Sequence, residues 1–213
     1  MKNENLKEKS YKVIKSKITS CEYIPNEFIN ESALREEIGV SRTPIREALS
    51  RLEQENLVKI IPKRGVLVTD ISIIEINELF QVRELIEPYI IRTYAKNIDK
   101  IELSRLYNIL IVKVSNSDIE AYSIDEDIHR LLVNSSNNRY FVSIMENIYS
   151  QNHRIRVLTG KQIEKRLDQT NKEHIEILKF LIQEDWDSAA SSMVTHLKNS
   201  KMVAVDRWYQ KNL

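Results

Sequence analysis

The chain has 213 residues, of which 42% are hydrophobic and 30% charged, and its formal net charge is +1 at pH 7. This length allows one large domain or two small ones with a buried core, and a nearly neutral chain needs a local basic patch to bind nucleic acid. The single cysteine, Cys21, excludes an intramolecular disulfide and fits a reducing cytoplasm. The sequence shows no apolar core of a signal peptide and no run of about 18 apolar residues, the length of a membrane-spanning helix. We therefore expect a cytoplasmic protein without a membrane partner.

Short elements are predicted before residue 70, where three of the four prolines lie. Residues 6–20 predict a helix, because its apolar residues fall loosely on one face: Leu6, Tyr11, Ile14 and Ile18. The stretch 24–28 (IPNEF) predicts a loop. A second helix follows, with Asn30 as its N-cap and Gly39 as its left-handed C-cap.

A third helix is predicted after Ser41, its expected N-cap, with Pro44 in the first turn where a missing N–H costs nothing. Its apolar residues share one face: Ile45, Ala48, Leu49 and Leu52. Arg42, Thr43 and Arg46 lie on the other side of its N-terminal end. Such an end can bind phosphate and contact guanine edges.

A β-hairpin is predicted from two β-branched runs, 57–61 and 65–68, on either side of Pro62 to Gly65. Its tip carries Lys63, Arg64 and Gly65, which suits phosphates or a minor groove. Helix, tight turn, helix and hairpin, in this order, predict a winged helix-turn-helix. The alternative for the third helix alone is a solvated amphipathic helix with scattered arginines. In the DNA-binding interpretation, Arg51 lies farther along the helix and is expected to bind phosphate or form a salt bridge.

Long helical periods dominate the rest of the chain, so we predict two domains, 1–70 and 71–213, with a joint at 68–72. Six helices are expected, near 72–97, 100–115, 118–133, 138–157, 162–183 and 185–208. The default architecture is an antiparallel bundle. The fold class is therefore mostly α, with a small β-hairpin wing.

Three histidines and one aspartate are predicted to point into this bundle from three helices: Asp125, His129, His174 and His196. His153, the fourth histidine of the chain, lies off the apolar stripe of its helix. Three neutral nitrogens and one oxygen suit a divalent metal such as zinc, nickel, manganese, iron or cobalt. The alternative is a set of core histidines that bond to Asp125 or to serine and tyrosine hydroxyls.

The stretch VSRTPIREALSRLEQENLV followed by PKRGVLV closely resembles the DNA-binding domain of GntR-type bacterial regulators over about residues 10–68. The resemblance implies DNA contacts by Arg42, Thr43, Arg46 and the wing from Lys63 to Gly65. Asn56 and Asn26 replace glycines of the family pattern, and asparagine tolerates a left-handed backbone. Ser32 stands where some members place a DNA-contacting arginine.

Residues 72–208 resemble the FCD ligand-binding domain of the FadR-like branch, in its shorter, VanR-like six-helix variant. The matching segments are Val82-Arg83 with Glu87, Asp125 with Ile128-His129, Glu173-His174, and Thr195-His196-Leu197. The resemblance implies a divalent metal, with zinc, nickel and manganese favoured, on Asp125, His129, His174 and His196. It also implies a small organic acid as effector, with Arg83 as the best candidate to pair its carboxylate ahead of Arg130 and Arg154. A salt bridge to a nearby glutamate is the alternative for each arginine.

We therefore expect a homodimeric transcription regulator, most simply a repressor, that binds a double-stranded operator and responds to a small carboxylate. It would not be an enzyme. The alternatives are a metal-dependent hydrolase with a DNA-binding appendage and an architectural DNA binder with an inert core.

Overall fold

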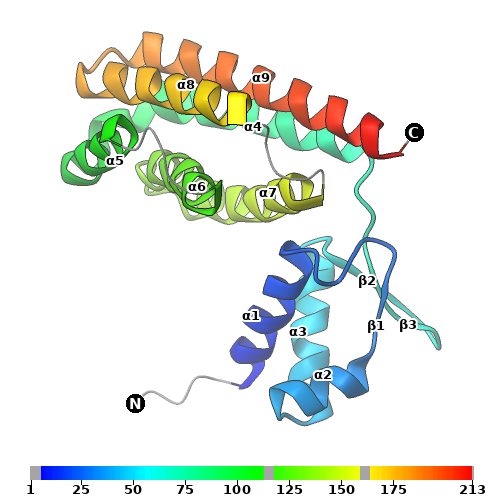
Figure 1. Ribbon diagram of the computed structural model, residues 1–213. Helices are drawn as coiled ribbons and strands as arrows, with labels where there is room; N and C mark the ends of the chain where they lie inside the picture. Colours follow the sequence, from blue (N-terminus) through cyan, green and yellow to red (C-terminus); the bar gives the residue numbers. More distant parts are fainter. Residues whose placement is uncertain (1–5, 113–117, 159–163, 213) are drawn as a thin grey trace. The chain divides into compact units, whose positions relative to one another are not determined.

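The computed structural model describes residues 6–112, 118–158 and 164–212, which form two compact units (Figure 1). The first unit contains the chain up to residue 72 together with residues 150–158. The second contains residues 73–149 and the chain after 158. The predicted helix breaks at Asn116-Ser117 and Thr159-Gly160 lie outside the described residues.

The first unit is a winged helix-turn-helix, as predicted. Its elements are α1 (Leu6–Thr19), β1 (Phe28–Ile29), α2 (Glu31–Ile38), α3 (Arg42–Gln54), β2 (Val58–Ile61) and β3 (Gly65–Val68). The sheet is antiparallel in the order β1-β3-β2, with Phe28 opposite Leu67 and Val58 opposite Val68. The expected loop at 24–28 is wrong at its last residue, because Phe28 pairs with the wing and adds a third strand.

Capping residues set the bounds of α2 as the sequence predicts. The Asn30 side chain accepts hydrogen bonds from the amides of Ser32 and Ala33, and Gly39 has φ 73° with its N–H donating to the carbonyl of Arg35. Asn26 and Asn56 also have positive φ, 67° and 57°. Ser41 occupies the N-cap of α3, as predicted, although its side chain makes no cap hydrogen bond.

The core of the first unit joins α1, α2, α3 and the sheet around fully buried residues that include Ile14, Leu34, Ile45 and Leu52. Leu6 departs from the predicted stripe and is exposed. The C-terminal end of α7 (Arg139–Leu158) belongs to this unit. There Arg154 is fully buried, and its guanidinium donates to the Thr69 carbonyl at 2.7 Å and to Gln151 Oε1 at 2.8 Å.

The second unit is the predicted helical bundle. Its elements are α4 (Ile73–Tyr94), a 3-10 turn η1 (Ala95–Asn97), α5 (Lys100–Val112), α6 (Asp118–Asn134), the first part of α7, α8 (Glu164–Ile182) and α9 (Trp186–Asn212). Helices α4, α8 and α9 lie side by side in Figure 1. Pro88 is buried inside α4, which continues to Tyr94. Among the described helices, none has the length and apolar character needed to cross a membrane.

Candidate metal centre and nucleic-acid interface

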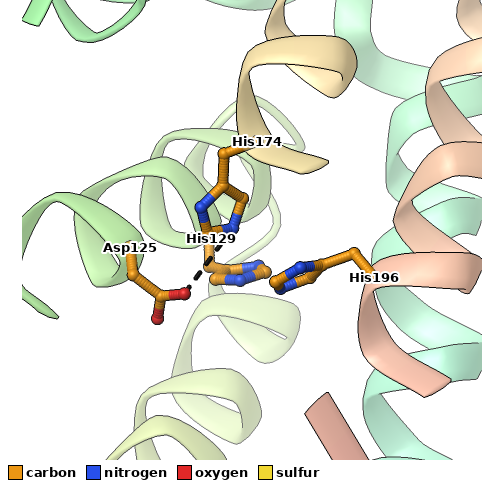
Figure 2. A group of neighbouring side chains, drawn as sticks. All are labelled: Asp125, His129, His174 and His196. Atoms are coloured by element: carbon orange, nitrogen blue, oxygen red, sulfur yellow. Dashed lines mark ion pairs between the residues drawn. The ribbon is translucent and has the colours of Figure 1, made fainter. Parts of the chain in front are cut away.

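Three helices of the second unit bring together all four predicted ligand residues (Figure 2). Asp125 and His129 are four residues apart on α6, so they share one face of that helix. His174 comes from α8 and His196 from α9. All four side chains are buried, since each lies on a face that otherwise packs apolar residues such as Ile128, Leu178 and Met193.

One ligand atom from each residue lies within 4.8 Å of the others. The His174 and His196 rings are 4.4 Å apart between centroids, and the His174 Nε2 atom lies 3.6 Å from Asp125 Oδ1. Two ligands about 2.1 Å from one ion are at most about 4.2 Å apart. The four residues therefore lie near the spacing that a small divalent cation requires, and would close around it on binding.

A glutamate on α4 fixes the orientation of His129. The Nδ1 atom of His129 lies 2.5 Å from Glu87 Oε2, and Glu87 Oε1 accepts a hydrogen bond from Arg83 Nε at 2.7 Å. The Nε2 atom of His129 is buried and has no hydrogen-bond partner. A buried ring nitrogen without a partner destabilises the folded protein. A histidine that binds a metal leaves one ring nitrogen open for the ion and bonds the other to a carboxylate, and His129 shows this arrangement.

A second glutamate orients His196 in the same way. Glu173 Oε2 lies 2.9 Å from His196 Nδ1, and Asn199 donates to Glu173 Oε1 at 2.8 Å. Burial lowers the pKa of His196 even though Glu173 opposes the shift, so its imidazole is held neutral and suited to bind a cation. Sequence reasoning did not assign Glu87 or Glu173 to the site, although both lie in the segments that carry the FCD resemblance.

The three arginines considered for an effector lie in different surroundings. Arg83 is buried against Glu87, and its Nη2 atom has no hydrogen-bond partner. Arg130 forms ion pairs with Glu126 and Glu146, both at 2.9 Å. Arg154 belongs to the first unit. Arg83 is linked to the histidine cluster through Glu87, which contacts both Arg83 and His129.

His153 is not part of the cluster that joins Asp125 and the other three histidines. It lies on the part of α7 that belongs to the first unit. His153 is therefore not among the candidate metal ligands, as its position off the apolar stripe predicts.

The residues predicted to contact DNA are exposed on the first unit. Arg42, Thr43 and Arg46 lie on the first turns of α3, and Lys63 and Arg64 lie at the tip of the wing beside Gly65. Both α3 arginines are about 4 Å from Glu31 Oε2 and keep more than half of their side-chain surface open to solvent. Lys63 has φ 64° and Gly65 has φ 114°, which places the basic residues at a tight turn.

Arg51, farther along α3, lies exposed on the surface of the first unit, where its side chain is held by neighbouring residues. Its guanidinium stacks 3.6 Å from the centre of the Tyr11 ring and pairs with Glu8 at 3.0 Å and Glu55 at 3.4 Å. These contacts tie α3 to α1. They favour the salt-bridge interpretation of Arg51 over a phosphate contact.

A winged helix-turn-helix joined to an all-helical bundle with an inward cluster of histidines defines a class of DNA-binding transcription regulators. Comparison with known proteins agrees: the model of the bacterial regulatory proteins of the gntR family matches residues 6–68, and that of the FCD domain matches residues 78–199. The chain belongs to the GntR family and carries an FCD domain. It is a transcription regulator and not an enzyme.

Relatives with curated descriptions are transcription regulators, and two of them match this chain over most of their length. The chain is 27% identical to the uncharacterized regulator YdhC of Bacillus subtilis, with 89% of this chain and 86% of YdhC covered. It is 23% identical to the repressor RspR of Escherichia coli, with 88% and 84% covered. Its identity to the gluconate operon repressor of Bacillus licheniformis is 29%, over 56% of this chain and 51% of that repressor.

Solved structures share the fold. McbR/YncC of E. coli superposes with a TM-score of 0.81 at 16% identity and covers 99% of this chain and 100% of its own. The Zn²⁺-bound FCD domain of the regulator TM0439 gives a TM-score of 0.58 at 22% identity, over 66% of this chain and 99% of its own.

Proposed function

We propose that this regulator is a homodimeric repressor whose helical domain, residues 71–213, holds a divalent metal and senses a small organic acid. Its winged helix-turn-helix, residues 1–70, binds the operator, in the cytoplasm where that DNA lies. The observation that carries the proposal is the buried cluster of one aspartate and three histidines, with ligand atoms within 4.8 Å of each other. Both RspR and the gluconate operon regulator are named repressors.

The proposed metal is zinc, nickel or manganese, held by Asp125, His129, His174 and His196. Glu87 and Glu173 support it because they orient two of the histidines through Nδ1. The related FCD domain of TM0439 is described as zinc-bound, which adds support. When bound, such a cation supplies a Lewis-acidic site for a carboxylate oxygen.

The proposed effector is a small carboxylate, and Arg83 is its proposed partner in the protein. The Nη2 atom of Arg83 is a buried donor without a partner, although Nε already bonds to Glu87. A carboxylate that accepted a hydrogen bond from this nitrogen would satisfy it. The relative named for the gluconate operon makes sugar acids the first compounds to test.

A thermal-shift screen of small carboxylates, gluconate included, tests the sensing proposal on the metal-loaded protein. At least one acid should raise the melting temperature and change affinity for operator DNA selected from random sequences. The sensing proposal is wrong if DNA affinity stays the same with every acid tested and also after the metal is removed. A coupling of about 1–3 kcal/mol between the two sites is enough to switch operator occupancy.

The proposed route from effector to DNA runs through α7 and the joint at 68–72. The Tyr149 hydroxyl donates to the carbonyl of His129 at 3.3 Å, and Arg154, five residues later on the same helix, donates to the carbonyl of Thr69 in the joint. A shift of the metal ligands would thus reach the residue that connects the wing to α4. In a dimer this would alter the spacing of the two DNA-binding units.

The proposed DNA contacts are Arg42, Thr43 and Arg46 at the start of α3, with Lys63, Arg64 and Gly65 at the wing. Ser41 makes no side-chain cap hydrogen bond, so the first N–H groups of α3 can serve a phosphate. Arginine at such an end can donate two hydrogen bonds to guanine O6 and N7.

Replacement of Arg46 by alanine should weaken specific operator binding by about 1–3 kcal/mol, because a bidentate base contact is lost. Gel-shift titration against the selected operator measures the change. Arg105→Ala is the matched control, since Arg105 is an equally exposed arginine on α5 that pairs with Glu102. Equal affinity of the two variants would mean that α3 does not contact base edges.

A further inference from the structure

A glutamate of α2 faces both arginines at the start of α3. Glu31 is the first residue of α2, directly after the Asn30 N-cap, and its Oε2 atom lies 4.0 Å from Arg42 Nε and 3.8 Å from Arg46 Nε. Its side chain is 26% exposed, against 62% for Arg42 and 59% for Arg46. One partly buried carboxylate is therefore shared by two exposed guanidinium groups.

The geometry of these contacts suits arginines that contact bases. Both distances exceed hydrogen-bond length, so the attraction is between charges. Each shortest contact reaches Nε, the nitrogen nearest the side-chain stem, and so does not occupy the terminal nitrogens that can donate to guanine. Arg42 and Arg46 are four residues apart, where like charges on a helix repel. The shared carboxylate offsets that repulsion and draws both groups toward one point.

Glu31 makes these contacts instead of an ion pair along its own helix. Arg35 comes four residues later on α2, the spacing at which glutamate and arginine commonly pair. Among the residues that the structure describes, however, the ion pairs of Glu31 join it to α3 and not to Arg35. Ion pairs this exposed contribute little to folding stability. The arrangement therefore matters for the two arginines more than for the fold.

A negative charge at this place also acts on binding to DNA of any sequence. Contacts between cations and phosphates supply essentially all non-specific affinity. A carboxylate beside the arginines repels the phosphate backbone and weakens those contacts. Base contacts depend instead on where each arginine points. A residue that repels the backbone and orients the arginines raises the ratio of specific to non-specific affinity.

We propose that Glu31 is a positioning residue that sets the specificity of operator recognition. It orients Arg42 and Arg46 toward base edges and weakens their attachment to DNA of unrelated sequence. The inference rests on the proposed DNA contacts of α3 and adds a residue that acts on the operator through those arginines. Helix α2 thereby takes part in recognition through a charge and not through a base contact of its own.

Glu31→Gln tests the proposal in the full chain, because glutamine keeps the shape of the side chain and removes its charge. Affinity for unrelated duplex DNA should rise, and the ratio of operator affinity to unrelated-DNA affinity should fall about tenfold, as for one weakened bidentate base contact. Fluorescence anisotropy at several salt concentrations measures both. The salt slope for unrelated DNA should steepen by up to about 0.9, the value for one more neutralised phosphate. The melting temperature should stay close to that of the wild type.

Glu37→Gln is the matched control. It removes the same charge from the same helix, at a residue whose carboxylate pairs with Lys17 of α1 at 2.9 Å. It should leave the ratio of operator affinity to unrelated-DNA affinity as in the wild type. If Glu31→Gln changes this ratio no more than Glu37→Gln does, the proposal is overturned.

A double-mutant cycle with Arg46→Ala shows whether Glu31 acts through the arginines. Glu31→Gln should change the affinity ratio less in the Arg46→Ala background than in the wild type. An equal change in both backgrounds means that Glu31 contacts DNA itself, and this also overturns the proposal.

The same variants distinguish this proposal from the proposed function. If Arg46→Ala weakens operator binding but Glu31→Gln leaves the affinity ratio unchanged, the positioning role is wrong while the DNA contacts of α3 stand. If Arg46→Ala binds the operator as tightly as its Arg105→Ala control, the proposed contacts of α3 are wrong, and Glu31 does not act through them.

Discussion

Replacement of Glu87 by alanine should lower the free energy of unfolding by about 3–5 kcal/mol, the cost of removing one partner of a buried ion pair. Glu87 is fully buried between Arg83 and His129. Its loss leaves the Arg83 guanidinium buried without a counter-charge and His129 Nδ1 without an acceptor. Urea unfolding of metal-free wild type and variant measures the difference.

The double variant Arg83→Met with Glu87→Met is the matched control, because it removes both charges and keeps the volume apolar. It should lose less stability than Glu87→Ala, because it leaves no buried charge unpaired, although His129 Nδ1 still lacks its acceptor. A single Glu87→Ala variant that is no less stable than this double variant would show that Arg83 does not depend on Glu87.

The same ion pair predicts how stability depends on pH. Burial alone would raise the pKa of Glu87, but the charge of Arg83, together with hydrogen bonds from Arg83 and His129, outweighs it and holds this pKa at about 2, below the ordinary 4.5. A carboxyl with a depressed pKa in the folded state stabilises the fold fully above pH 4.5 and loses that contribution as pH falls toward 2. Glu87→Ala should therefore flatten the acid side of the stability curve.

The fold followed from sequence where the determining interactions are local. Apolar spacing predicted the helices, and the left-handed positions of Gly39 and Asn56 followed from residues that tolerate positive φ. The third strand was missed because Phe28 and Ile29 are too short a run to show alternation, and their strand exists only through pairing with β3. The N-cap position of Ser41 was predicted correctly, but the preference of serine for this position does not fix its side-chain conformation, and no cap hydrogen bond forms.

The candidate site was only partly predictable for the same reason. Spacing places Asp125 and His129 on one face of α6, but it does not show which residues of α4 or α8 lie behind the histidines. Glu87 is 42 residues from His129, and Glu173 is 23 from His196. The contacts of both glutamates with the histidines form only when the helices pack, so the sequence does not indicate them. The surroundings of Arg130 depend likewise on Glu146, from a different helix.

Removal of the metal should strongly destabilise the helical domain. A ligand bound only by the folded state stabilises it by about 4 kcal/mol when its free concentration is 1,000 times the dissociation constant. For a chain of this size that corresponds to a fall in melting temperature of about 8–16 °C on chelation. The protein purified without chelator should contain one divalent ion per chain, measured by elemental analysis.

His174→Ala should abolish this metal content, because it removes one of four buried ligands. His153→Ala is the matched control, a histidine outside the cluster, and should retain the ion. Core histidines that merely bond to Asp125 would give the opposite pattern: a purified wild type with little metal, and a melting temperature unchanged by chelation. The buried Nε2 of His129 has no hydrogen-bond partner among the residues that the structure describes, and this makes metal the expected result, because a bound ion would stabilise an imidazole nitrogen enclosed in this way.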